Sequence, residues 1–199
     1  VGVSFAKALA MSLNLPLIEV NHMEAHVLAH FIEEPKPQFP FLCLTVSGGH
    51  TQLVWVKSAL EMEVIGETRD DAVGEAFDKT AKLLGLPYPG GPLIDRYAQQ
   101  GNPLAYPFPI SEVADLNFSF SGIKTSILYF VQKSLAQDPA FLEKHLADLC
   151  ASVQYRLVEI LVKKVRKAMQ EQHCQQLAIA GGVAANSGLR KRLQSLAQE

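Results

Sequence analysis

The hydrophobic pattern is organised around residues 41–56, where two apolar runs flank a short polar turn. The first run reads FLCLTV, the turn reads SGGHT and the second run reads QLVWV. Both runs are rich in aromatic and β-branched residues, and the Gly-Gly pair between them allows a tight reversal. This pattern predicts a β-hairpin, and residues 61–68 predict a third strand after it.

Helical stripes and one more strand follow the hairpin. Apolar spacing predicts helices over 3–13, 22–31, 71–84, 92–100, 123–135 and 183–197, and a long helix that begins near Pro139. Short apolar runs at 15–20 and 176–180 predict buried strands. Prolines interrupt residues 102–117, which we expect to form a loop. Strands that are followed by helices and by a final strand–helix unit indicate an α/β domain.

Three Gly-Gly pairs stand at the junctions of these elements, at positions 48–49, 90–91 and 181–182. Successive N–H groups without side chains form concave anion sites, and helix N-termini add unpaired donors and partial positive charge. Pro92, at the start of a predicted helix, strengthens the expectation of exposed donors at the second pair. One pair alone would indicate only a turn. The three together predict a nucleotide cleft.

His22 and His26 stand four residues apart, so on a helix their rings project from one face within reach of one metal ion. A zincin protease needs Glu directly after the first histidine, but Met23 stands there. Two ordinary helix histidines beside a core explain the same spacing, and a metal site needs at least one more ligand. For His30 we expect a role in packing or in supporting the two metal ligands.

Acidic side chains occupy the predicted helix 71–84, where Asp71, Glu75 and Asp78 lie along one flank. Such carboxylates could bind ribose hydroxyls or orient a metal-bound water. A solvated acidic face paired with Lys79 and Lys82 explains the same pattern, and the residues alone favour it.

The charge and the composition exclude several classes of protein. The net charge of −2 does not indicate nucleic-acid binding, so the basic clusters at 163–167 and 190–192 are interpreted as solvated helix faces, with RNA contact as the alternative. The apolar runs are shorter than the roughly 20 residues of a membrane span. Three scattered cysteines indicate reduced thiols in a cytosolic protein. We therefore expect a cytoplasmic location and no membrane partner.

Six motifs, in order along the chain, resemble one family. They are HMEAH at 22–26, VSGGHT at 46–51, DDAVGEAFDK at 70–79, YPGGP at 88–92, FSFSGIKT at 118–125 and AGGVAAN at 180–186. The family is that of the tRNA N6-adenosine threonylcarbamoyltransferases, called TsaD in bacteria and formerly O-sialoglycoprotein endopeptidase. Thr45 and His50 resemble the bacterial or mitochondrial members.

The resemblance implies an actin-like, sugar-kinase-like ATPase fold of two lobes. Residues 1–37 would belong to the N-terminal lobe and carry the His-x-x-x-His helix, and residues 38–199 would form most of the second lobe. The family's N-terminal and C-terminal segments, including the third metal ligand, would lie outside these residues. We therefore expect a fragment that is inactive alone.

The implied reaction transfers the threonylcarbamoyl group from threonylcarbamoyl-AMP to N6 of the adenine next to the anticodon, in tRNAs that read codons starting with A. His22 and His26 would hold one divalent metal ion, Fe²⁺ or Zn²⁺. The adenylate site would comprise Thr45, Val46, Ser47, Gly48, Gly49, Asp78, Gly91, Asp95 and Asn186. No residue is assigned as the general base.

The implied partners are tRNA, a TsaB-like inactive paralogue and a TsaE-like small ATPase. Three alternatives remain at this point. They are a non-catalytic scaffold of the same fold, a metalloprotease as the older family label suggests, and a nucleotide-switch ATPase of the chaperone type.

Overall fold

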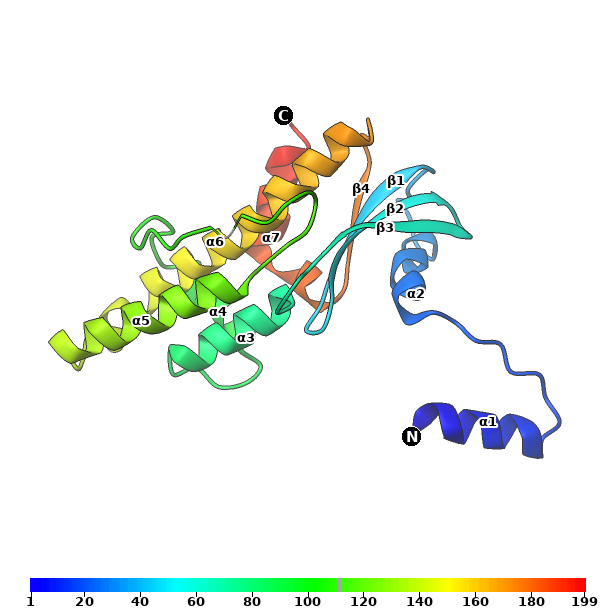
Figure 1. Ribbon diagram of the computed structural model, residues 1–199, viewed down its shortest axis with the longest axis horizontal. Coiled ribbons are helices and arrows are strands. Elements are labelled where there is room, and N and C mark those ends of the chain that lie inside the picture. The colour runs from blue at the N-terminus through cyan, green and yellow to red at the C-terminus, as the bar shows by residue number, and fades with distance from the viewer. Residues whose placement is uncertain (111) are drawn as a thin grey trace.

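A four-stranded mixed sheet forms the centre of the protein, which a computed structural model describes over residues 1–110 and 112–199. Its strands are β1 (Phe41–Val46), β2 (Thr51–Ser58), β3 (Glu61–Glu67) and β4 (Leu177–Ala180). The order across the sheet is β3-β2-β1-β4, with β1 antiparallel to β2 and parallel to β4 (Figure 1). The predicted hairpin, the third strand and the strand at 176–180 are confirmed.

Five helices lie to one side of the sheet (Figure 1). They are α3 (Val73–Leu83), α4 (Gly90–Ala98), α5 (Ser121–Gln137), α6 (Phe141–Glu171) and α7 (Ser187–Leu196), with the 3₁₀ turn η2 (Gly182–Ala185) before α7. Their apolar stripes share one core with Leu42, Leu44 and Leu53 of the sheet, all fully buried. The predicted helices are confirmed, with ends that shift by a few residues.

The opposite face of the sheet is covered by α2 (His22–Leu28) and the 3₁₀ turn η1 (Ala29–Phe31). Val27 of α2 is 1% exposed and packs in a second cluster with Phe41 and Cys43 of β1. Successive residues of β1 therefore face different cores, because side chains alternate along a strand. This explains why the first apolar run has no polar alternation.

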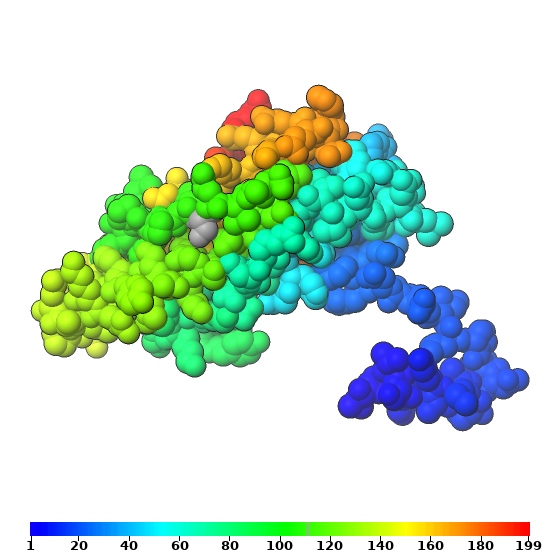
Figure 2. All heavy atoms as spheres, in the orientation of Figure 1, coloured from blue at the N-terminus to red at the C-terminus, as the bar shows by residue number. Residues whose placement is uncertain are grey.

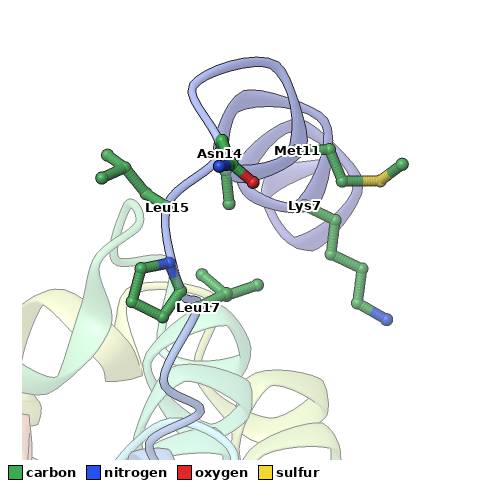
Figure 3. Close-up of a pocket in the computed structure, with 7 residues that line it drawn as sticks. Lys7, Met11, Asn14, Leu15 and Leu17 are labelled. Carbon is green, nitrogen blue, oxygen red and sulfur yellow. The ribbon is translucent and has the colours of Figure 1, made fainter.

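The first twenty residues lie apart from this core (Figures 1 and 2). The helix predicted at 3–13 is confirmed as α1 (Gly2–Ser12), but none of its residues is buried. The strand predicted at 15–20 is wrong, because these residues are exposed and have no secondary structure. An apolar run becomes a strand only beside a sheet neighbour, and among the described residues this run has none. Figure 3 shows an open hollow beside α1, lined by Lys7, Met11, Asn14, Leu15 and Leu17.

Residues 102–110 and 112–117 form no helix or strand, as predicted for this loop, and Ser111 lies outside the described residues. In the described part of the chain, every helix is too short or too polar to cross a membrane.

Candidate functional site

The turn between β1 and β2 is held by its flanking residues and leaves its glycines free. The Ser47 N–H donates to the His50 carbonyl (2.8 Å), and the His50 N–H donates to Ser47 Oγ (3.0 Å). Among the described residues, no acceptor lies against the N–H groups of Gly48 and Gly49. A Cβ built on either glycine meets no atom within 4 Å. This turn therefore presents open N–H donors, as the sequence predicts.

Two other glycines allow neighbouring elements to approach this turn. A Cβ on Gly74, in the first turn of α3, would lie 2.6 Å from the Ser47 carbonyl oxygen and 2.8 Å from Gly48 Cα. Gly181 follows β4 with φ +92°, and its Cβ would lie 2.8 Å from the Val46 carbonyl carbon. Only glycine fits such contacts, so the start of α3 and the turn after β4 close onto the end of β1 (Figure 1).

The second glycine pair has a different environment from the one predicted. Asp78 Oδ1, on α3, accepts hydrogen bonds from the N–H groups of Gly90 (2.8 Å) and Gly91 (3.2 Å). The expectation that these N–H groups are open to a phosphate is wrong, because a carboxylate already caps the N-terminus of α4. This edge of the site is acidic.

Asp95 and Asn186 secure the N-terminus of α7. Asp95 accepts hydrogen bonds from the Ser187 N–H (3.0 Å) and from Ser187 Oγ (2.6 Å). Asn186 is 8% exposed, and its Oδ1 accepts the Leu189 N–H (2.9 Å) as the N-cap of α7. Its Nδ2 donates to Gln154 Oε1 (2.8 Å) on α6. These bonds fix the turn after β4 against α4 and α6.

A cavity of about 380 Å³ lies among these turns, within the range of small-molecule sites. It is lined by Gly48, Gly74, Phe77, Asp78, Tyr88, Pro89, Gly91, Pro92, Asp95, Gly182, Val183, Ala185 and Asn186. All three glycine pairs thus contribute to one cavity, which is the convergence that their positions predict. The predicted residues on its wall are Gly48, Asp78, Gly91, Asp95 and Asn186.

The other predicted adenylate residues do not line the cavity. Thr45 (2% exposed) and Val46 (0%) are buried within β1, and Thr45 Oγ1 donates to the Gln52 carbonyl. Ser47 and Gly49 belong to the adjoining turn. Gly74 on the wall was missed as a site residue, although a glycine within a predicted helix is a signal of close approach.

The paired histidines lie on α2, outside the cavity. His22 Nε2 and His26 Nε2 are 3.2 Å apart, so the two rings do share one helix face. Asn21 is the N-cap of this helix, because its Oδ1 accepts a hydrogen bond from the Met23 N–H (2.9 Å). The two histidines that the resemblance assigns to the metal therefore do not line the cavity formed at the glycine pairs.

The spacing of the two ring nitrogens suits a shared metal ion. Two ligands at the usual zinc–nitrogen distance and a tetrahedral angle are separated by about 3.3 Å. In the described part of the chain, no group of three His, Cys, Asp or Glu side chains is arranged to hold a metal. Among the described residues, the two histidines therefore form a pair of donors without a third His, Cys, Asp or Glu beside them.

The acidic residues of the predicted helix 71–84 divide into two groups, and Asp71 itself precedes α3. Lys79 Nζ pairs with Asp71 Oδ1 (2.7 Å) and with Glu75 Oε1 (2.8 Å), and these hydrogen bonds raise the pKa of Lys79. The interpretation as a solvated, lysine-paired face is confirmed for Glu75, whose side chain is 44% exposed. It is wrong for Asp71, which pairs with Lys79 but is only 18% exposed and has a buried Oδ2 without a hydrogen-bond partner among the described residues. Asp78 is separate, because it faces α4 and the cavity.

Comparison with known proteins establishes the relationship that the motifs suggest. The family model described as "TsaD: tRNA N6-adenosine threonylcarbamoyltransferase" matches residues 1–199. The chain belongs to this family. Curated relatives with the same description include those of Cytophaga hutchinsonii, 63% identical over 194 residues, and Christiangramia forsetii, 63% identical over 202 residues. They cover 98% and 100% of this chain, which spans only 57% and 59% of their own lengths.

Two solved structures resemble the fold at 14% sequence identity. One is component A of (R)-2-hydroxyglutaryl-CoA dehydratase from Acidaminococcus fermentans, with a TM-score of 0.52 over 87% of this chain and 57% of that one. The other is the activator of 2-hydroxyisocaproyl-CoA dehydratase from Clostridium difficile with bound ADPNP, with a TM-score of 0.50 over 88% and 56%. At this identity the likeness concerns the fold alone, and it confirms the α/β fold class.

The family motif at 118–125 meets the motif at 70–79 through Asp70. The Asp70 carboxylate accepts hydrogen bonds from Ser119 Oγ (2.5 Å), the Phe120 N–H (2.8 Å) and Ser121 Oγ (2.7 Å). Burial raises the pKa of Asp70, but the hydrogen bonds together outweigh burial, and the net shift is downward. The contact fixes the start of α5 beside the segment that leads into α3.

The basic clusters are largely paired within the protein. Lys163 pairs with Glu112 (2.6 Å), and Arg192 pairs with Glu159 (2.8 Å). Lys164 donates to two backbone carbonyls. These contacts support the interpretation as ordinary helix faces.

Proposed function

We propose that the protein transfers the threonylcarbamoyl group from threonylcarbamoyl-AMP to N6 of the adenine next to the anticodon, in tRNAs that read codons starting with A. The observation that carries the proposal is the family match along all 199 residues, together with the cavity at the three glycine pairs. A cytoplasmic location goes with this proposal. The proposal also includes three partners: tRNA, a TsaB-like paralogue and a TsaE-like ATPase. It divides the chain into lobes at residues 1–37 and 38–199.

The electrostatics of the cavity suggest one orientation for the adenylate. The N–H donors of Gly48 and Gly49 are open and attract the phosphate. Asp78 and Asp95 repel a phosphate but accept hydrogen bonds from ribose hydroxyls. The phosphate would therefore lie toward the β1–β2 turn and the ribose toward α4. The base would lie against the apolar part of the cavity lining.

The proposed reaction is an acyl transfer. The N6 nitrogen of the tRNA adenine attacks the carbamoyl carbonyl carbon, forming a C–N bond, and the C–O bond to the phosphate breaks. AMP departs with that electron pair, and N6 loses a proton. The open N–H groups of Gly48 and Gly49 would stabilise negative charge that grows on the phosphate or on the carbonyl oxygen.

His22 and His26 would hold one divalent metal ion, Fe²⁺ or Zn²⁺, with at least one ligand from outside the described residues. When bound, such an ion acts as a Lewis acid toward carbonyl or phosphate oxygens. We expect His22→Ala to abolish metal retention in the full-length protein, measured by mass spectrometry of the purified protein for metal content. His173→Ala is the control, because His173 lies in the turn after α6. A fully metallated His22→Ala protein would refute the ligand role.

The function is tested by nucleoside analysis of tRNA after depletion of the full-length protein. We expect threonylcarbamoyladenosine to disappear and to return when the wild-type gene is supplied. Unchanged levels would exclude the proposal. The scaffold alternative predicts that the purified protein, with tRNA and threonylcarbamoyl-AMP, transfers nothing. The protease alternative predicts chelator-sensitive digestion of casein, which the missing glutamate after His22 argues against.

A further inference from the structure

One aromatic side chain on the wall of the cavity has no role in the fold. Tyr88 is 85% exposed, whereas Phe77 on the same wall is 2% exposed and belongs to the core. Tyr88 immediately precedes Pro89, the N-cap of α4, and the tie between Asp78 and Gly90 fixes this turn. A large ring is therefore held at the mouth of a cavity while most of its surface is in water.

The surroundings of the ring suit a flat partner. Pro89 and Pro92 also line the cavity and add apolar surface to it. The carboxylates of Asp78 and Asp95 lie on the same wall and would repel an anionic group there. A neutral aromatic ring satisfies both conditions, and nucleic-acid bases stack on tyrosine in this way.

We propose that Tyr88 is the platform on which an adenine ring stacks at the mouth of the cavity. This inference rests on the proposed function, in which two adenines reach the site: that of the adenylate and that of the tRNA. Both adenines present the same flat ring to Tyr88, so the cavity supports stacking of either one. The experiment that follows distinguishes the two sources. A stacking contact of this kind changes affinity by about 5- to 150-fold.

The experiment uses full-length wild-type protein and the variants Tyr88→Ala, Tyr88→Phe and Tyr129→Ala. Tyr129 is the matched control, because it is 67% exposed on α5 and does not line the cavity. Titration calorimetry measures the Kd for AMP, and single-turnover transfer at saturating threonylcarbamoyl-AMP measures the dependence on tRNA concentration. The melting temperature of Tyr88→Ala should match that of wild type, since the ring is almost fully in solvent.

If the adenylate supplies the base, Tyr88→Ala raises the Kd for AMP by about 5- to 150-fold; if tRNA supplies it, the half-saturating tRNA concentration rises by the same factor. Tyr88→Phe should stay within about twofold of wild type, because the ring remains. Wild-type values for Tyr88→Ala in both measurements, or equal losses in Tyr88→Phe, would overturn the proposal. Failure of the wild-type protein to transfer any group would refute the proposed function instead, and the AMP titration would still test the ring.

Discussion

Gly181 and Gly182 are adjacent in the sequence, yet the structure assigns them opposite roles. Gly181 has φ +92° and ψ 168°, and a Cβ there would collide with the carbonyl group of Val46. A Cβ on Gly182 meets no atom within 4 Å, and Gly182 lines the cavity. We therefore expect Gly181→Ala to damage the fold and Gly182→Ala to damage only ligand binding.

The magnitude for Gly181→Ala follows from two terms. Its backbone conformation is essentially restricted to glycine, and another residue there costs about 1–3 kcal/mol. The Cβ would lie 2.8 Å from the Val46 carbonyl carbon, and relieving such a contact in a packed region costs about 1–3 kcal/mol more. The sum of about 2–6 kcal/mol is a large part of a typical stability. In a domain of this size it lowers Tm by roughly 4–24 °C.

The assay compares thermal melts and AMP titrations of the two full-length variants. Gly182→Ala should melt within a few degrees of wild type, but should bind AMP more weakly because its methyl group enters the cavity. A Gly181→Ala protein as stable as wild type would show that the turn after β4 does not press on β1 as described. Equal destabilisation by both substitutions would refute the distinction between them.

Two further predictions concern groups with shifted pKa values. Asp70→Asn should destabilise the protein by about 1 kcal/mol at neutral pH, because it removes a charged acceptor from three donors, while the exposure of Asp70 to solvent reduces the loss. The pKa of Asp70 is lowered from 3.8 in the folded state, so its stabilisation is present above about pH 4 and is lost as pH falls through the folded pKa. Thermal melts of wild type and Asp70→Asn should therefore converge in acid, and a constant gap would contradict the assignment. Burial raises the pKa of Cys43 and Cys150 to about 12. Iodoacetamide at pH 8 should therefore label the half-buried Cys174 in the native protein and should label Cys43 and Cys150 only after unfolding. Labelling of Cys43 in the native protein would contradict its burial.

The sequence predicts elements well where periodicity and turn residues agree. The hairpin at β1 and β2 has two β-branched runs and a glycine turn, and α6 has a long apolar stripe, so local and tertiary preferences coincide. The apolar run at 15–20 has strand character but no sheet neighbour among the described residues. Periodicity reports the capacity of a segment to be buried, and the packing partner decides whether burial occurs.

The site is predictable in its components and less so in its contacts. Spacing places His22 beside His26, because four residues make about one helical turn. Spacing does not reveal that Asp78 reaches across 12 residues to the N–H groups of Gly90 and Gly91. That contact depends on how α3 packs against α4, for which the sequence carries no local signal.

The three glycine pairs are alike in sequence but differ in what their backbones can bind. Gly48 and Gly49 present free N–H donors, whereas the N–H groups of Gly90 and Gly91 are hydrogen-bonded to Asp78. Gly181 has no side chain and so allows the turn after β4 to pack closely against the end of β1. A cavity with three open anion sites would have no preferred direction for a nucleotide. Under the proposed function, the open donors of Gly48 and Gly49 would attract the phosphate and the carboxylates of Asp78 and Asp95 would repel it, so this asymmetry would orient an adenylate. Asp78 would contribute to this direction in two ways, because its carboxylate lines the cavity and its two hydrogen bonds occupy the donors of Gly90 and Gly91 at the start of α4.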